Sequence, residues 1–120
     1  MPLISIVDDD ESVRNALKSL IDSVGFRAEV FDSGEKFLNS PYLSQTDCLI
    51  ADVRMPGMSG LELQDRLSAA GRSIPIVFIS AHEDNEARAR GLRAGAIDFL
   101  QKPFSEDSLL GAISVCLDKS

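Results

Sequence analysis

Residues 48–60 place a single carboxylate between an apolar segment and a loop that cannot extend it. The stretch reads Cys-Leu-Ile-Ala-Asp-Val-Arg-Met-Pro-Gly-Met-Ser-Gly. The small and apolar residues before Asp52 predict a buried strand. Pro56 and Gly57 end it, because proline lacks a backbone N–H and glycine favours turns. We therefore expect Asp52 at the carboxyl end of a central strand, the edge at which open parallel sheets bind their ligands.

Patterns on either side of this stretch predict the remaining elements. Short apolar runs predict strands at residues 3–7, 26–31, 48–52, 74–79 and 96–100. Helical periodicity and capping residues predict helices at residues 11–24, 34–40, 60–70, 84–94 and from 105 onward. The second strand alternates between apolar and charged side chains, which is typical of an edge strand. The fourth helix has a thin apolar stripe, Ala87 and Leu92, and we expect it to be weakly attached.

Short crossover helices between strands require parallel pairing and right-handed connections. The economical solution is an α/β fold, a flavodoxin-like doubly wound sheet of five parallel strands in the order 2-1-3-4-5 with five helices. A chain of 120 residues fits one such unit. We therefore expect a single domain over residues 1–120.

The overall composition excludes several classes of function. The formal net charge of −7 argues against direct binding of nucleic acid or an anionic membrane. No apolar run reaches membrane-spanning length and no secretion signal opens the chain, so we expect a cytoplasmic protein. Cys48 and Cys116 both lie in apolar surroundings, and we expect two reduced structural thiols rather than a disulfide or a metal site.

The predicted strand order brings polar residues from several strands to one edge. The first and third strands are neighbours, so Asp8, Asp9 and Asp52 are expected to meet there. Three carboxylates repel one another unless a cation joins them, and Mg²⁺ suits a site with few protein ligands. Lys102 can add positive charge, and Ser80 offers a hydroxyl. This set suits phosphoryl chemistry, with Asp52 as the nucleophile that forms an aspartyl phosphate.

Taken one at a time, these residues have simpler explanations as turn, cap or surface positions. Four short segments carry a more specific pattern. They read Ile-Val-Asp-Asp-Asp at 6–10, Ala-Asp-Val-Arg-Met-Pro-Gly-Met-Ser-Gly at 51–60, Ile-Ser-Ala at 79–81 and Ala-Gly-Ala-Ile-Asp-Phe-Leu-Gln-Lys-Pro-Phe at 94–104. In this order and spacing they resemble the receiver domain of two-component response regulators over essentially the whole chain. The amino-acid sequence of these segments is most similar to the FixJ-type branch of that family.

The resemblance implies a role for each of the acidic residues. Asp52 corresponds to the phosphoacceptor, which takes its phosphoryl group from a histidine kinase. Asp9 and Asp52 would ligate Mg²⁺ directly, together with the backbone carbonyl of Arg54. Asp8 would act through a metal-bound water.

The resemblance also implies a switch. Lys102 would pair with the phosphoryl oxygens, and Ser80 would be drawn toward them. Phe99 would turn inward as the hydroxyl moves, and the Lys102–Pro103 peptide is typically cis in this family. Arg54 and His82 occupy two variable positions that tend to tune hydrolysis of the aspartyl phosphate in this family. For His82, a plain loop histidine is the simpler interpretation. The side chain of Arg54 is left with two interpretations, contact with the phosphoryl group or a solvated loop residue.

The expected output is a surface made by the helix at 84–94, the strand at 96–100 and the last helix. We expect it to mediate homodimerisation or to dock an output domain that regulates transcription. A FixJ-like protein would continue into a DNA-binding domain, so this domain would not itself contact nucleic acid. The protein would be a signalling switch rather than a dedicated enzyme, with only self-phosphorylation and slow autodephosphorylation.

Three alternative functions are compatible with this fold or with the same residues. The acidic run at 8–10 also resembles the start of haloacid-dehalogenase-type phosphohydrolases, with Asp8 as nucleophile and Asp10 as acid/base. That family needs a further acidic pair on a late strand end, where this chain has Lys102. The second alternative, a receiver that has lost phosphorylation, is disfavoured by the intact set of site residues. A flavin-binding protein of this fold is disfavoured because the first strand ends in acids rather than in a phosphate-cradling loop.

Overall fold

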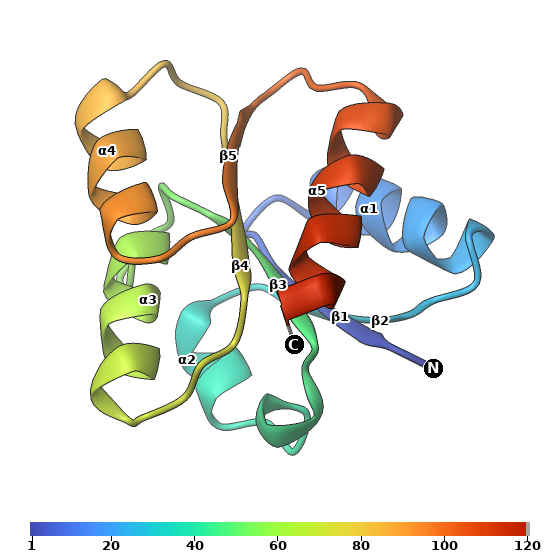
Figure 1. Ribbon diagram of the computed structural model, residues 1–120, viewed down its shortest axis with the longest axis horizontal. Helices are drawn as coiled ribbons and strands as arrows, with labels where there is room; N and C mark the ends of the chain where they lie inside the picture. Colours follow the sequence, from blue (N-terminus) through green and yellow to red (C-terminus); the bar gives the residue numbers. More distant parts are fainter. Residues whose placement is uncertain (120) are drawn as a thin grey trace.

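Five short strands lie side by side in one parallel sheet, in the order β2-β1-β3-β4-β5 (Figure 1). The computed structural model describes residues 1–119. The strands are β1 Leu3–Val7, β2 Arg27–Phe31, β3 Cys48–Asp52, β4 Ile76–Ser80 and β5 Asp98–Gln101. The predicted fold class and strand order are therefore confirmed.

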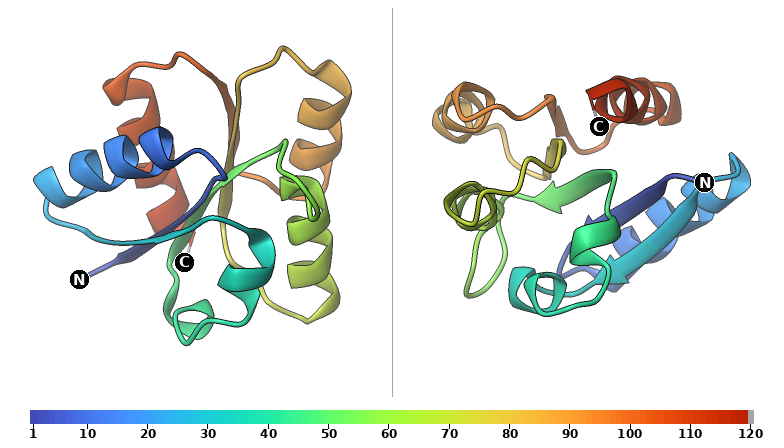
Figure 2. Two further views of the ribbon diagram at one scale, coloured as in Figure 1. Left: turned by 180° about the vertical axis from the view of Figure 1, so that it is seen from behind. Right: turned by 60° about the horizontal axis from the view of Figure 1, so that its bottom comes forward.

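Residues 1–119 also form five α-helices and one 3₁₀ helix. They are α1 Glu11–Ser23, α2 Gly34–Leu38, η1 Leu43–Gln45, α3 Gly60–Ala69, α4 Asn85–Arg93 and α5 Glu106–Lys119. Helices α1 and α5 cover one face of the sheet, and α2, α3 and α4 cover the other (Figure 2). No helix in residues 1–119 combines the length and the apolar character needed to cross a membrane.

Each central strand divides its side chains between two hydrophobic layers. In β3, Leu49 and Ala51 pack under α2, α3 and α4, whereas Cys48 and Ile50 pack under α1 and α5. This alternation follows from the two-residue period of a strand. All five residues of β1, β3 and β4 are buried, while β2 keeps one exposed residue and partly exposed side chains. The edge position predicted for β2 is confirmed.

Helix α4 differs from its prediction in one packing detail. Its buried residues are Ala87 and Gly91, and Leu92 is exposed. Gly91 lies against the ring of Phe78, where an added Cβ would sit 3.0 Å from Phe78 Cε2. The absence of a side chain, rather than an apolar side chain, therefore allows α4 to approach the sheet.

Candidate functional site

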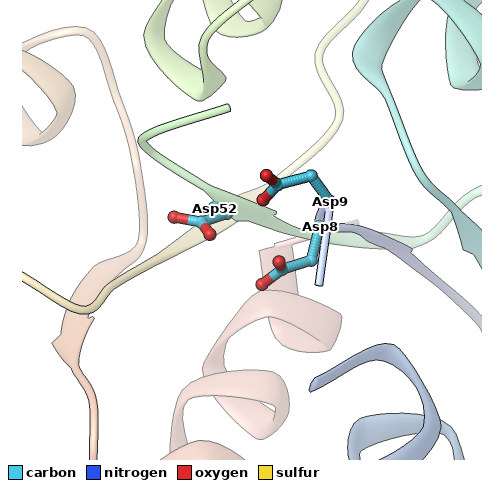
Figure 3. A group of neighbouring side chains, drawn as sticks. All are labelled: Asp8, Asp9 and Asp52. Atoms are coloured by element: carbon cyan, nitrogen blue, oxygen red, sulfur yellow. The ribbon is translucent and has the colours of Figure 1, made fainter. Parts of the chain in front are cut away.

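Three carboxylates lie together beyond the ends of β1 and β3 (Figure 3). The pairing of Val7 with Ala51 brings these two strand ends level. Asp8 and Asp9 directly follow β1, and Asp52 is the last residue of β3. Each side chain offers an oxygen within 4.8 Å of the others. Asp8 and Asp52 are buried, whereas Asp9 is exposed.

The loop after β3 turns back tightly on the end of its strand. The backbone N–H of Gly60 donates to the carbonyl of Val53, and Gly60 lies so close to the Asp52 carbonyl that a Cβ would collide with it. Ser59 caps α3 by accepting a hydrogen bond from the Glu62 N–H at 3.1 Å. These contacts leave the carboxylate of Asp52 at the edge of the sheet.

Lys102 lies between two of the carboxylates. Its Nζ is 3.1 Å from Asp8 Oδ2 and 3.4 Å from Asp52 Oδ2, and its side chain is 20% exposed. The backbone N–H of Lys102 donates to the Ser80 carbonyl at 2.7 Å, which fixes it beside the end of β4. The Lys102–Pro103 peptide is cis, as the resemblance implied.

The site carries more negative charge than one lysine neutralises. Burial, followed by the nearby charge of Asp8, raises the pKa of Asp52, and Lys102 offsets only part of this effect. Burial alone would lower the pKa of Lys102, but the carboxylates of Asp52 and Asp8 outweigh it and raise that pKa. A cation placed among the carboxylates would therefore relieve repulsion between them.

The donor set fits a hard divalent cation. Oxygen ligands from carboxylates are those that Mg²⁺ prefers, with water completing its shell. Both oxygens of Asp8 already accept hydrogen bonds, one from the Asp10 N–H at 2.9 Å and one from Lys102. Asp52 likewise accepts through both oxygens, from the Arg54 N–H at 3.2 Å and from Lys102 at 3.4 Å. A carboxylate oxygen keeps a further lone pair beside one hydrogen bond, so the three side chains present fit such a cation.

Ser80 lies at the end of β4 and is fully buried. Its hydroxyl donates to the His82 carbonyl at 3.0 Å and accepts from the His82 N–H at 3.1 Å. The Phe99 ring is already buried and packs against Phe78, with 6.3 Å between ring centroids. The hydroxyl is thus bonded within its own loop while the ring is inward.

The structure adds two residues that the sequence did not single out. Arg14, on the first turns of α1, donates from Nη1 to the Asp8 carbonyl at 2.8 Å. Asp84 forms an ion pair with Arg54, with Nη2 and Oδ2 3.0 Å apart. The side chain of Arg54 is therefore turned toward α4 rather than toward Asp52. The sequence pattern placed Asp84 at the start of a helix over residues 84–94, whereas in the structure Asp84 is the N-cap of α4. The pattern gave no sign of its partner.

Comparison with known proteins agrees with this geometry. Residues 4–114 match the model of the response regulator receiver domain. The chain is 50% identical over 115 residues to the response regulator protein TmoT of Ectopseudomonas mendocina, which covers 96% of this chain and 52% of TmoT. It is 40% identical over 111 residues to the transcriptional regulatory protein FixJ of Bradyrhizobium diazoefficiens, covering 92% of this chain and 54% of FixJ. The chain thus spans about half the length of these curated relatives.

A solved structure of the response regulator StyR superposes with a TM-score of 0.91 at 50% identity, covering 98% of this chain and 59% of that one. None of these matches supports the haloacid-dehalogenase alternative. These similarities agree with the geometry of the site, in which an acidic cluster lies beside the lysine that follows β5. The chain belongs to the response regulator receiver domain family, the phosphorylatable receivers of two-component signal transduction.

Proposed function

We propose that Asp52 is the phosphoacceptor of this receiver and that its donor is the phosphohistidine of a histidine kinase. In the transfer, the P–N bond to the donor imidazole breaks and a P–O bond to the Asp52 carboxylate forms. The observation that carries the proposal is the position of this carboxylate. It ends a central strand within reach of Lys102, Asp8 and Asp9.

The surrounding residues would bind the metal ion and orient the phosphoryl group. Asp9, Asp52 and the backbone carbonyl of Arg54 would ligate Mg²⁺, and Asp8 would hold it through a water. The ion supplies neutralisation of charge on the phosphoryl oxygens. Lys102, already held beside Asp52, would pair with a phosphoryl oxygen and keep the group oriented.

Release of the phosphoryl group would occur by slow hydrolysis at the same site. A water attacks phosphorus, the P–O bond to Asp52 breaks, and inorganic phosphate leaves. His82 and Arg54 would tune this step. The protein would therefore cycle between two states of one carboxylate and act as a signalling switch rather than as a dedicated enzyme.

The output would pass through α4, β5 and α5. Ser80 would follow the phosphoryl group, with Phe99 reporting its position to this surface. We propose one receiver domain over residues 1–120 that works in the cytoplasm. The surface would form a homodimer or dock an output domain that controls transcription. The net charge of −7 supports leaving any contact with nucleic acid to that other domain.

The test is phosphorylation by acetyl phosphate with Mg²⁺, followed by intact-mass spectrometry. The wild-type protein should gain one phosphoryl group, and Asp52→Asn should gain none. Asp65→Asn, which removes an exposed carboxylate on α3, is the matched control and should be phosphorylated normally. Uptake that survives Asp52→Asn would remove the assignment.

A further inference from the structure

Arg54 joins the loop that carries the phosphoacceptor to the start of α4. Its backbone N–H donates to Asp52 Oδ1 at 3.2 Å. Its guanidinium reaches in another direction, to Asp84 Oδ2 at 3.0 Å. One residue thus contacts the carboxylate of Asp52 through its backbone and the first turn of α4 through its side chain.

Asp84 uses both of its carboxylate oxygens. Oδ1 accepts a hydrogen bond from the Ala87 N–H at 3.0 Å and caps α4, while Oδ2 binds Arg54. An aspartate at an N-cap satisfies a free backbone donor and favours the positive end of the helix. A change in the ion pair between Arg54 and Asp84 would therefore alter the capping of the first turn of α4.

Helix α4 depends on few attachments, so each has influence. Only Ala87 and Gly91 are buried among its residues. In the middle of the helix, Arg88 Nη1 donates to the Phe99 carbonyl of β5 at 3.1 Å. The C-terminal half is linked from Arg90 to Asp65 and from Gln64 Nε2 to the Gly91 carbonyl. The ion pair of Arg54 and Asp84 instead ties its N-terminal turn to the phosphoacceptor loop.

The guanidinium has room to change partners. The ion pair spans a cleft of about 560 Å³ between the loop after β3 and α4. The Arg54 side chain is 58% exposed, and that of Asp84 is 23% exposed. An exposed ion pair is weak, on the order of 1 kcal/mol or less, and a stronger anion nearby can displace it.

We propose that Arg54 is a positioning residue shared between Asp84 and a phosphoryl group on Asp52, so that phosphorylation loosens the first turn of α4. The inference rests on the proposed function of Asp52. A phosphoryl group adds negative charge and acceptor oxygens two residues from Arg54. Guanidinium groups bind such oxygens in bidentate geometry, which an aspartate already engaged as a cap does not match.

Because the coupling is reciprocal, weakening the ion pair must strengthen binding of the phosphoryl group. The probe is beryllofluoride, a phosphoryl mimic, added with Mg²⁺ and followed by NMR titration. Asp84→Asn keeps a capping side chain but removes the charge. In the wild-type background, Asp84→Asn should lower the Kd for beryllofluoride. The factor should be about two- to fivefold larger than the factor that the same substitution produces in the Arg54→Gln background. Comparing the two backgrounds removes the general effect of one fewer negative charge.

Asp65→Asn is the matched control, because it breaks the exposed ion pair of Arg90 at the other end of α4. It should leave the affinity for beryllofluoride unchanged. Equal effects of Asp84→Asn in both backgrounds would overturn the coupling. Absence of any beryllofluoride binding to the wild-type protein would instead overturn the assignment of Asp52, so the two failures are distinguishable.

A second measurement reads α4 directly. Hydrogen exchange of the Ala87 amide reports the cap, because that N–H donates to Asp84. Beryllofluoride should speed this exchange in the wild-type protein, and the acceleration should be lost in Arg54→Gln. Retention of the full acceleration in Arg54→Gln would show that α4 responds by another route, and the proposal would fall.

Discussion

The hydroxyl of Ser80 both donates to and accepts from the backbone of His82, at 3.0 and 3.1 Å. The hydroxyl therefore organises the loop between β4 and α4 before any phosphoryl group is present. To follow a phosphoryl group on Asp52, Ser80 must give up the His82 carbonyl. In the proposed switch, the contribution of Ser80 would be the rearrangement of this loop.

Replacing Ser80 by alanine should uncouple phosphorylation from the loop. Ser80→Ala should lower the free energy of unfolding by about 1 kcal/mol, because the His82 N–H loses its acceptor. Asp52 should still be phosphorylated by acetyl phosphate, while the backbone NMR shifts that beryllofluoride induces at His82 disappear. Ser80→Thr retains the hydroxyl and should retain the shifts. Normal shifts in Ser80→Ala would show that the hydroxyl does not drive the rearrangement.

The raised pKa of Asp52 predicts how stability changes with pH. Burial and the charge of Asp8 raise this pKa above its ordinary value of 3.8. The contribution of Asp52 to stability is therefore complete below that value and is lost as pH rises through the folded-state pKa. In the presence of a chelator, Asp52→Asn should gain stability relative to wild type as pH rises through this range. Urea denaturation at several pH values measures the difference, and a constant difference would contradict the expectation.

Magnesium should make the wild-type protein more stable than Asp52→Asn, the reverse of the order expected with a chelator at higher pH. An ion that binds only the folded state stabilises it by about 2.7 kcal/mol at one hundred times its Kd. Wild type should gain more from Mg²⁺ than Asp52→Asn, which lacks one ligand. Removing the ion with a chelator should restore the original order of stabilities. Equal stabilisation of both proteins would place the ion elsewhere.

Most of the fold follows from the sequence because its patterns are local. The apolar runs at residues 48–52 and 74–79 predict strands that the structure contains. Strand boundaries were less accurate. The fourth strand was expected from residue 74 and begins at Ile76, although the Pro75 carbonyl already accepts from the Leu49 N–H. The chain thus runs beside β3 before regular pairing starts.

The sequence predicted which side chains lie together in the site, but not which hydrogen bonds and ion pairs they form. Strand order alone brings Asp8, Asp52 and Lys102 to one edge. The partner of Arg54 could not be inferred, because Asp84 is thirty residues away and an exposed arginine can reach several anions. The packing of Gly91 was missed for a different reason. A glycine that allows close packing because it has no side chain cannot be recognised from the spacing of apolar residues in the sequence.

Lys102 should support the fold as well as the chemistry. Lys102→Met keeps most of the stem but leaves two buried carboxylates without their shared cation. Without divalent ions we expect a loss of about 2 kcal/mol, below the range for a fully buried pair because the lysine is partly exposed. Mg²⁺ should recover much of the loss. Lys36→Met breaks an exposed ion pair with Asp32 and should change stability by less than about 1 kcal/mol. Equal effects of the two variants in chemical denaturation would contradict this role.

The close approach of α4 to the sheet predicts opposite outcomes for the same substitution at two helical glycines. A Cβ added to Gly111, on α5, would meet no atom within 4 Å, whereas at Gly91 the Cβ would lie 3.0 Å from the Phe78 ring. Gly111→Ala should stabilise the protein by up to about 1 kcal/mol through helix propensity. Gly91→Ala should destabilise it by about 1 to 2 kcal/mol, because overpacking exceeds that gain. It should also disturb the NMR shifts of α4. Thermal denaturation compares the two variants, and stabilisation by Gly91→Ala would show that α4 can move away from Phe78 at little cost.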